Sequence, residues 1–395
     1  QMCIRDRTLN LSQNIPWTGG SLFLETSAQR MDLFSEHKYS WQTSPIMIGY
    51  RQSLFGYNSL KWDKRIEPVR YQEAKKSYVE TLELVSANAI NKFFALATAQ
   101  SNYDIASFNY ANADTLYRYA QGRYNIGTIT ENEMLQLELN RLTEETNRMN
   151  ARIEMDNCMQ ELRSYLGIQE EREIRVRVSS RIPDFSINLN EALALAYENS
   201  PDIQTMKRRK LESESAVARA RANAGLKADI YLRFGLTQTA DKLPEAYRNL
   251  LDQQYVSLSI SLPILDWGRG KGQVRVARSN RDLVYTQVEQ NRTDFELNVR
   301  KLVKQFNLQT QRVRIAARTD ETAQRRNEVA RKLYILGKST ILDLNASISE
   351  KDSARRNYVS ALYNYWSLYY TLRSMTLYDF ESNKLLTEDY NLLIE

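Results

Sequence analysis

The feature that most constrains this chain is an internal repeat that relates its first half to its second. When the sequence is displaced by 210 residues, Gly127 falls on Gly337. The acidic residues six positions after these glycines also coincide, because Glu133 falls on Asp343. Self-similarity at a fixed displacement is typical of duplicated structural units. We therefore expect two copies of one unit, each with the same order of secondary structure.

Long helices are predicted by the distribution of proline and glycine. Residues 69–182 and 264–395 contain no proline, and glycine is rare in both stretches. Because proline interrupts helices and glycine weakens them, each stretch is permissive for two long helices that meet near Gly127 or Gly337. Small and apolar residues recur there every three or four positions, a spacing typical of coiled coils. The helices alone leave an ordinary antiparallel coiled coil open as an interpretation.

Other segments alternate polar and apolar residues with a period of two, as strands do. In residues 256–262, serines alternate with four aliphatic residues: Val256, Leu258, Ile260 and Leu262. Residues 230–237 show the same alternation, residues 46–54 match it in the first copy, and a weaker segment surrounds Leu22. Each repeat is thus expected to hold two strands before its helical hairpin. In the second copy, a helix at about 189–226 precedes the strands.

Four strands per chain raise the question of what covers them. Helical hairpins of this length offer no globular layer, and a closed membrane barrel needs about eight strands or more. Three copies of the chain would supply about twelve strands, with the aliphatic residues of 256–262 facing lipid and the intervening serines facing a water-filled lumen. We therefore expect a mainly α protein with a β part that assembles as a homotrimer. Its strands would form a 12-stranded barrel.

Composition excludes several classes of function. The chain has one histidine, His37 in a polar loop, and two cysteines, which leaves neither a histidine-rich metal site nor a disulfide framework. The glycine-rich segment 268–272 lacks the spacing of a phosphate-binding loop, and no acid, base and nucleophile converge in the pattern. We expect no enzyme, no cofactor and no metal. The net charge of +6 leaves a basic coiled-coil scaffold open as an alternative, although a scaffold does not explain the alternating strands.

Several motifs resemble those of one known family. The turn pattern Tyr-x-x-Gly-x-x-Thr occurs at 124–130 and at 334–340, and the last strand exits through Leu-Pro-Ile-Leu-Asp-Trp-Gly at 262–268. Residues 13–20 read Gln-Asn-Ile-Pro-Trp-Thr-Gly-Gly, and residues 54–58 read Leu-Phe-Gly-Tyr-Asn. Over about 8–380, the duplicated order of these motifs resembles the TolC-like outer-membrane efflux protein family, in its Bacteroidetes-type branch.

The resemblance implies a function and a location. Such a chain would be the outer-membrane channel of a tripartite efflux or type I secretion system, a passive exit duct for drugs, toxins, metals or proteins. Its 12-stranded barrel would cross the outer membrane, and its helices would continue it as a coiled-coil barrel that forms a tunnel in the periplasm. Its partners would be two further copies, a periplasmic adaptor protein, an inner-membrane pump of the RND, ABC or MFS type, and outer-membrane lipid. No nucleic acid is implied.

The repeat also predicts domain boundaries. The first repeat is expected at 1–168, with strands at about 20–54 and a helical hairpin at about 66–166. A linker at 169–188 leads to the second repeat at 189–380, which has its strands at about 228–262 and its hairpin at about 270–376. Residues 381–395 would form a C-terminal tail. Because the first repeat begins almost at a strand, we expect its opening helix and a leader to be missing. We also expect the first seven residues to be non-native.

The resemblance further implies roles for the two helical turns. In the family the turns contact the adaptor, and here the corresponding residues are Gly127, Thr128, Thr130, Gly337, Lys338, Ser339 and Thr340. The acids Asp343 and Glu133 would line the periplasmic aperture, where three copies would form a ring that attracts cations and has a raised apparent pKa. The family's second acidic position is Ala346 in this chain. Two simpler interpretations stay open: the glycines only form turns, and Asp343 only caps the returning helix.

Overall fold

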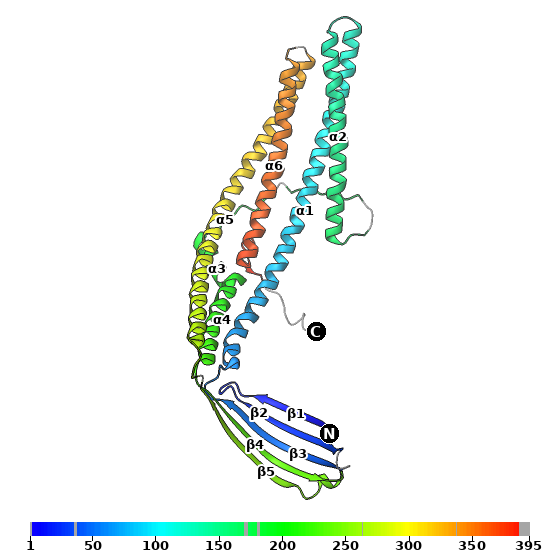
Figure 1. Cartoon of the computed structure of the whole chain (residues 1–395). Helices are drawn as coiled ribbons and strands as arrows, with labels where there is room; N and C mark the ends of the chain where they lie inside the picture. The colour runs from blue at the N-terminus through cyan, green and yellow to red at the C-terminus, as the bar shows by residue number, and fades with distance from the viewer. Residues whose placement is uncertain are drawn as a thin grey trace. The chain divides into compact units, whose positions relative to one another are not determined.

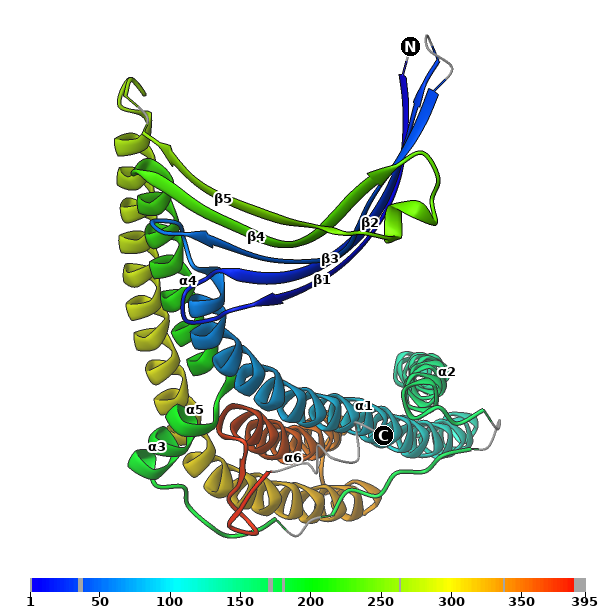
Figure 2. The ribbon, with the colours of Figure 1, turned by 90° about the horizontal axis from the view of Figure 1, so that it is seen from below.

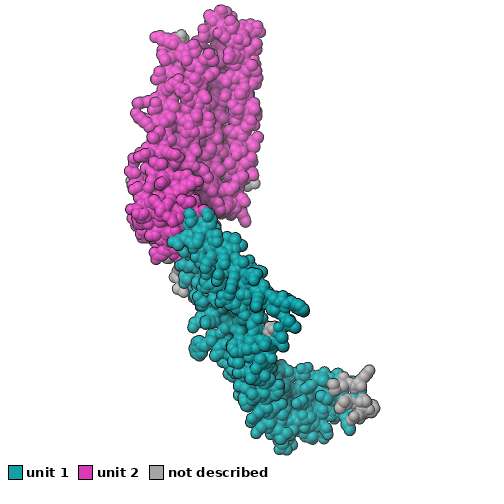
Figure 3. Space-filling model, turned by 60° about the vertical axis from the view of Figure 1, so that its left-hand side comes forward, with its two compact units in different colours: residues 1–74, 202–293 teal, residues 75–201, 294–395 magenta. Residues whose placement is uncertain are grey.

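The computed structural model describes residues 2–34, 38–169, 173–179, 182–262, 264–336 and 338–386. Two of the residues singled out above, His37 and Gly337, lie outside these ranges. The chain divides into two compact units, and each unit combines segments from both repeats (Figure 3). Unit 1 consists of residues 1–74 and 202–293, and unit 2 consists of residues 75–201 and 294–395.

Unit 1 contains a curved antiparallel sheet (Figures 1 and 2). Its strands are β1 (Met2–Asn14), β2 (Ser21–Leu33), β3 (Lys38–Ser53), β4 (Lys227–Ala240) and β5 (Leu251–Ser261), in the spatial order β1-β2-β3-β4-β5. The central pairing, β3 with β4, joins the first repeat to the second, from Ser53 opposite Asp229 to Trp41 opposite Ala240. The sheet is therefore built by both repeats together.

The sheet holds one strand more than the sequence predicted. β1 pairs with β2 along its whole length, from Met2 opposite Leu33 to Asn14 opposite Ser21. The prediction of four strands was wrong because only Leu9 and Leu11 alternate with polar neighbours in β1, whereas its first half is charged. The repeat was also misleading here, since a displacement of 210 residues aligns β1 with a helix of the second copy.

The remainder of unit 1 is helical. It contains the start of α1 (Ser59–Asn125), the whole of α4 (Pro201–Ala224) and the start of α5 (Arg269–Ile335). The expected helix at about 189–226 is divided into α3 (Leu189–Asn199) and α4 at Pro201. Proline has no N–H to donate to the preceding turn, and its ring clashes with that turn. α1 begins at Ser59 rather than at about 66, because it continues through Pro68.

An ionic network joins α1 to α4 within unit 1. The Arg208 guanidinium donates to the Glu73 carboxylate at 2.6 Å and to Glu212 at 2.9 Å. The Thr205 hydroxyl donates to the same Glu73 carboxylate at 2.8 Å. Mainly because of the Arg208 hydrogen bond, the pKa of Glu73 lies below its usual value. These contacts hold α1, which follows β3, to α4, which precedes β4.

Unit 2 holds two helical hairpins of matching length, except for the starts of α1 and α5, which belong to unit 1. α1 and α5 have 67 residues each, and their partners α2 (Glu131–Leu166) and α6 (Ile341–Thr376) have 36 each. Between α1 and α2, a buried apolar cluster consists of Leu96, Ala99, Met155 and Leu162, with Tyr103 and Cys158 packed against it. Burial raises the pKa of the Cys158 thiol, as expected for a small core residue in the helical seam. Among the described helices, none is long and apolar enough to span a membrane.

The base of unit 2 is closed by the C-terminal segment. After α6, the short strands β6 (Tyr378–Asp379) and β7 (Lys384–Leu385) form a hairpin. Arg373 on α6 bonds to Glu83 on α1 at 3.0 Å and lies 3.5 Å from the Asp379 carboxylate. Beside it, Tyr369 and Phe306 pack ring to ring with centroids 6.0 Å apart. α1, α5, α6 and the terminal hairpin thus share one partly ionic core.

Candidate functional site

One face of the sheet is apolar and exposed. Residues that lie directly opposite one another on neighbouring strands share a face, and the register places Leu24 opposite Ile48 and Ile48 opposite Phe234. Eight large apolar side chains of this face are between 43% and 68% exposed: Leu22, Leu24, Ile46, Ile48, Phe234, Val256, Leu258 and Ile260. Leu262, just after β5, is 63% exposed. A sheet of a water-soluble protein buries such a face, so this face is free to meet another apolar medium.

Aromatic residues flank the apolar band at both ends. Towards the β2–β3 connection, the Arg30 guanidinium lies 4.9 Å from the ring centroid of Tyr39 and 5.7 Å from that of Trp41. At the opposite end, where the strands lead into helices, Trp17 is 85% exposed and Trp267 is 93% exposed. Girdles of aromatic residues at the two edges of an apolar band are typical of strands that cross a membrane.

The other face of the sheet is polar and closely packed. The Phe23 ring lies flat on Gly49, where a side chain would come within 2.0 Å of the ring, and it stacks on Tyr231 at 5.7 Å. The Arg51 guanidinium lies 5.5 Å from the Tyr231 ring centroid. This face also carries Glu25, which pairs with Arg233, and the β5 residues Ser257 and Ser259. The stacked rings of Phe23 and Tyr231 lie along this wall, and the charged and hydroxyl groups around them suit the polar face to line an aqueous lumen.

The first helical turn has a defined geometry. Gly127 adopts a left-handed conformation with φ of 73°, which a residue without a side chain accepts readily. Its N–H donates to the Tyr124 carbonyl at 2.8 Å, and the Thr128 N–H donates to the Arg123 carbonyl at 2.9 Å. These two bonds satisfy carbonyls at the end of α1. Gly127 and Thr128 are both exposed, as an adaptor contact requires.

Both returning helices begin with a capping box. The Thr130 N–H donates to the Glu133 carboxylate at 3.1 Å, and the Glu133 N–H donates back to the Thr130 hydroxyl at 3.3 Å. The residues at the corresponding positions of the second copy, Thr340 and Asp343, form the same reciprocal pair. The sequence signature of a capping box, Thr followed three positions later by an acid, is present at both turns.

Asp343 is therefore held by its own turn. Its carboxylate accepts hydrogen bonds from the Thr340 hydroxyl at 2.7 Å and from the Ser339 hydroxyl at 3.2 Å. These bonds, the one from Thr340 foremost, lower the pKa of Asp343. The capping role left open by the sequence is thus observed. Asp343 and Glu133 are also exposed, so an additional role at an aperture stays a prediction.

Sequence reasoning missed the apolar residues of the turns. Ile126 in the first turn is 74% exposed, and Leu336, its counterpart after a displacement of 210 residues, is 67% exposed. Leu342 beside the second turn is 71% exposed. The signal that could have identified them is the recurrence of an aliphatic residue directly before each turn glycine. Each turn therefore presents an apolar side chain together with hydroxyl groups.

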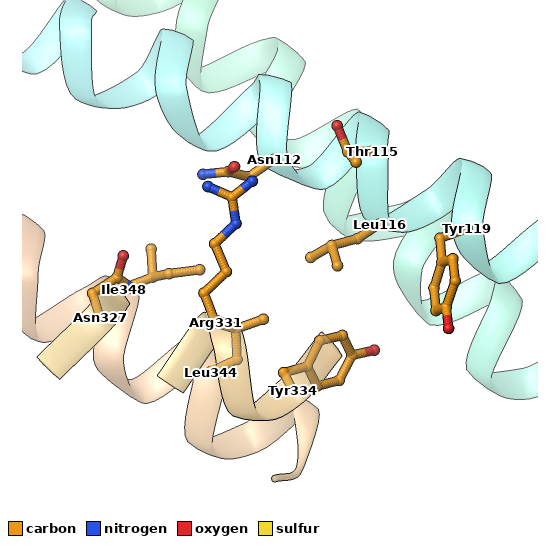
Figure 4. Close-up of a pocket in the computed structure, with 9 residues that line it drawn as sticks. All are labelled: Asn112, Thr115, Leu116, Tyr119, Asn327, Arg331, Tyr334, Leu344 and Ile348. Carbon is orange, nitrogen blue, oxygen red and sulfur yellow. The ribbon is translucent and has the colours of Figure 1, made fainter. Parts of the chain in front are cut away.

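A groove between the two hairpins opens near these turns (Figure 4). Its volume is about 230 Å³, and its walls come from α1, α5 and α6. The lining residues are Asn112, Thr115, Leu116, Tyr119, Asn327, Arg331, Tyr334, Leu344 and Ile348. Burial is the main cause that raises the pKa of Tyr334, and the nearby Arg123 acts in the opposite direction. The groove is largely apolar at its base and has polar groups around it.

Two further apolar stripes lie at the edges of unit 2. α1 packs against both α2 and α6, and α6 packs against α5, so α2 and α5 are the outer helices (Figure 1). On α2, five exposed apolar residues follow a spacing of mostly three or four: Leu135, Leu139, Leu142, Met149 and Ile153. On α5, three exposed apolar residues fall on a seven-residue spacing: Leu308, Ile315 and Val329. Such spacing is typical of a coiled-coil seam.

Comparisons with known proteins agree with this architecture. The family model described as outer membrane efflux protein matches residues 192–376. The fold is similar to the CmeC outer membrane channel of Campylobacter jejuni, with a TM-score of 0.71, 14% identity, and coverage of 100% of this chain and 80% of that one. It is also similar to the outer membrane protein VceC of Vibrio cholerae, with a TM-score of 0.67, 14% identity, and coverage of 95% and 87%. No curated protein is significantly similar in sequence.

Proposed function

We propose that this chain, whose second repeat belongs to the outer membrane efflux protein family, is the exit duct of a tripartite efflux or type I secretion system. The family model is described as outer membrane efflux protein, and proteins of similar fold are outer-membrane channels, which supports an outer-membrane efflux channel. The finer parts of the proposal are the homotrimer, the periplasmic adaptor, the inner-membrane pump of the RND, ABC or MFS type, and the cargo of drugs, toxins, metals or proteins.

The single observation that carries the proposal is the amphipathic sheet. Its apolar face carries exposed large side chains on each of β2, β3, β4 and β5, and its polar face carries Arg51, Arg233 and serines. In a bilayer every backbone polar group must be paired, so a sheet can span it only as a closed barrel. One curved sheet of five strands is too small to close, which favours a barrel built from several copies.

Assembly in a ring is supported by the two edge stripes of unit 2. Tyr119 and Arg331 line one groove, and they lie six and four residues before the ends of α1 and α5. Val329 lies six residues before the end of α5, and Leu135 and Leu139 lie four and eight residues after the start of α2. The α2 stripe of one copy can therefore interdigitate with the α5 stripe of the next. Contacts between two different surfaces generate rings when the rotation closes.

The sheet has five strands in each chain, one more than the four that a twelve-stranded barrel of three copies would take from each. β1 and β5 run in the same direction, because five antiparallel strands place the outer two parallel. A direct joint between β5 of one copy and β1 of the next would be a parallel pair, whereas outer-membrane barrels are antiparallel. An entirely antiparallel barrel of identical chains thus requires an even number of strands from each.

The adaptor is proposed to contact both helical turns and the groove between them. Hydroxyl groups of Thr128 and Ser339 lie beside the exposed side chains of Ile126 and Leu336. An adaptor hairpin of matching character, with small and apolar residues at its end, would bury these side chains. The acids Asp343 and Glu133 would lie at the same depth of the tunnel, where three copies form a carboxylate ring.

The experiment that tests the proposed function combines fractionation with electrical recording. We expect the protein to sediment with the outer membrane, to remain trimeric in mild detergent, and to give discrete conductance steps in planar bilayers. A protein that is soluble and monomeric without detergent, and that gives no conductance, would instead support the basic scaffold.

A further inference from the structure

We infer that the two strand-to-helix connections of unit 1 form a binding surface for anionic phospholipid headgroups of the leaflet that faces the periplasm. The inference rests on the proposed function, because it needs the apolar face of the sheet to lie in the membrane. It adds a specific lipid class as a ligand, and it gives a role to part of the excess positive charge of the chain.

Both connections expose large apolar side chains at the same end of the sheet. Ser53 at the end of β3 lies opposite Asp229, and Lys227 lies opposite Ser261 at the end of β5. After β3, Leu54 is 47% exposed and Phe55 is 55% exposed. After β5, the exposed fractions are higher, at 85% for Ile264, 78% for Leu265 and 93% for Trp267. The apolar surface therefore continues beyond the strands, past the band assigned to lipid.

Basic residues follow directly on the helices. In α1 they are Lys61, Lys64 and Arg65, and in α5 they are Arg269, Lys271 and Arg275, all of them exposed. The Arg65 guanidinium also lies 4.8 Å from the ring centroid of Trp62. The first two turns of each helix extend only about 10 Å from its start. The order along the chain is thus apolar, then aromatic, then basic, which matches the order from acyl chains to headgroup phosphates.

The acids of the region do not neutralise this surface. Asp266 is engaged locally, because its carboxylate accepts the N–H groups of Gly268 and Gly270 at 2.9 and 2.8 Å. Glu67 pairs with Arg70, further along α1. Asp63 is exposed between Lys61 and Lys64. The net charge of the two connections remains positive, which favours an anionic headgroup over a zwitterionic one.

The composition of the helix starts is unusual within this chain. Neither α1 nor α5 has an acidic residue in its first turn. In contrast, α2, α3, α4 and α6 all have at least one acid there, as the helix dipole favours. The two exceptions are the two helices that follow a strand of the sheet. Their basic first turns are therefore explained by what lies outside the helix, which at this position is the membrane surface.

The test measures lipid contact directly. The trimer is reconstituted in phosphatidylcholine nanodiscs that contain either brominated phosphatidylglycerol or the same fraction of brominated phosphatidylcholine, and quenching of tryptophan emission is compared. We expect stronger quenching by the anionic lipid in the unaltered protein, and this preference should weaken at high salt. Trp267→Phe should remove much of the quenched emission. Equal quenching by both lipids, or quenching that does not involve Trp267, would overturn the inference.

Charge-removing variants give the decisive comparison. The preference for the anionic lipid should fall severalfold in K61Q/K64Q, and likewise in R269Q/K271Q. The expected reduction is about fivefold for each basic residue that is removed from the surface. K207Q/R209Q removes two exposed charges from α4 about 25 Å from its sheet end and should leave the preference unchanged. An equal reduction in all three variants would overturn the inference. Failure to insert into phosphatidylcholine nanodiscs contradicts the proposed function, whereas insertion without preference contradicts only the lipid site.

Discussion

Thr340 and Asp343 hold one another at the start of α6. The Thr340 hydroxyl donates to the Asp343 carboxylate at 2.7 Å, and the Asp343 N–H donates back to the Thr340 hydroxyl at 3.2 Å. This relationship fixes the position of the carboxylate relative to the turn. A charge that is fixed in this way in each of three copies would form a regular ring at the tunnel end.

The first prediction separates the charge of Asp343 from its capping role. Asp343→Asn removes the charge but retains a side-chain acceptor, so it should weaken cation preference and block by multivalent cations without loss of trimer. Thr340→Ala keeps the charge but should destabilise the start of α6 by about 1 kcal/mol. Single-channel recording of both variants checks this. Unchanged selectivity in Asp343→Asn would leave only the capping role.

The second prediction concerns the orientation of β5. Leu258 lies on the apolar face, and its neighbour Ser259 lies on the polar one. Leu258→Arg should destabilise the inserted barrel by about 2–4 kcal/mol, as charged residues do on a lipid-facing strand near the middle of the bilayer. Ser259→Arg is the matched control and should be tolerated in the lumen. The yield of trimer in outer-membrane fractions is the measurement, and equal yields would contradict the assigned faces.

The third prediction tests the contact between copies. In a background where Cys3 and Cys158 are replaced by serine, L139C/V329C should give disulfide-linked dimers and trimers of the chain on oxidation. L139C/L308C serves as the control, because these positions differ by about 28 Å in height along the helices. Cross-linking in the control alone, or in neither, would show that α2 and α5 of neighbouring copies do not meet in this register.

The helical hairpins could be predicted because the sequence patterns that indicate them extend over many residues. Two proline-free stretches and the coincidence of Gly127 with Gly337 fixed the helices and their turns to within a few residues. The paired alternation in β4 and β5 was similarly clear. These elements are defined by local periodicity, which a sequence records directly.

Features that depend on contacts with distant segments of the chain were harder to predict. β1 has only Leu9 and Leu11 as an apolar alternation, and it is a strand because β2 offers it an edge along its full length. The exposure of Ile126 and Leu336 could not be predicted from the helical pattern, because that pattern assigns every apolar residue to the core. The Arg208 network was missed because it joins α4 to α1, which are more than 70 residues apart.

The fourth prediction concerns pH and unit 1. The pKa of Glu73 is lowered in the folded chain, mainly by its hydrogen bond from Arg208. The stabilisation is therefore present above the unfolded pKa of about 4.3 and is lost as pH falls through the lower folded value. Arg208→Met should lower the free energy of unfolding by about 1–2 kcal/mol at neutral pH, and by less in acid. Denaturant titration of the purified protein at neutral and acidic pH measures both values, and an equal loss at both would contradict this account.

The most direct test of the central claim follows the two faces of β5 residue by residue. Single spin labels are placed at each position from 256 to 261 of the reconstituted protein, and their collision rates with oxygen and with a water-soluble nickel chelate are measured. We predict a period of two, with positions 256, 258 and 260 accessible to oxygen in the lipid and positions 257, 259 and 261 accessible to the chelate in the lumen. Equal access of the chelate to all six positions would contradict a membrane barrel.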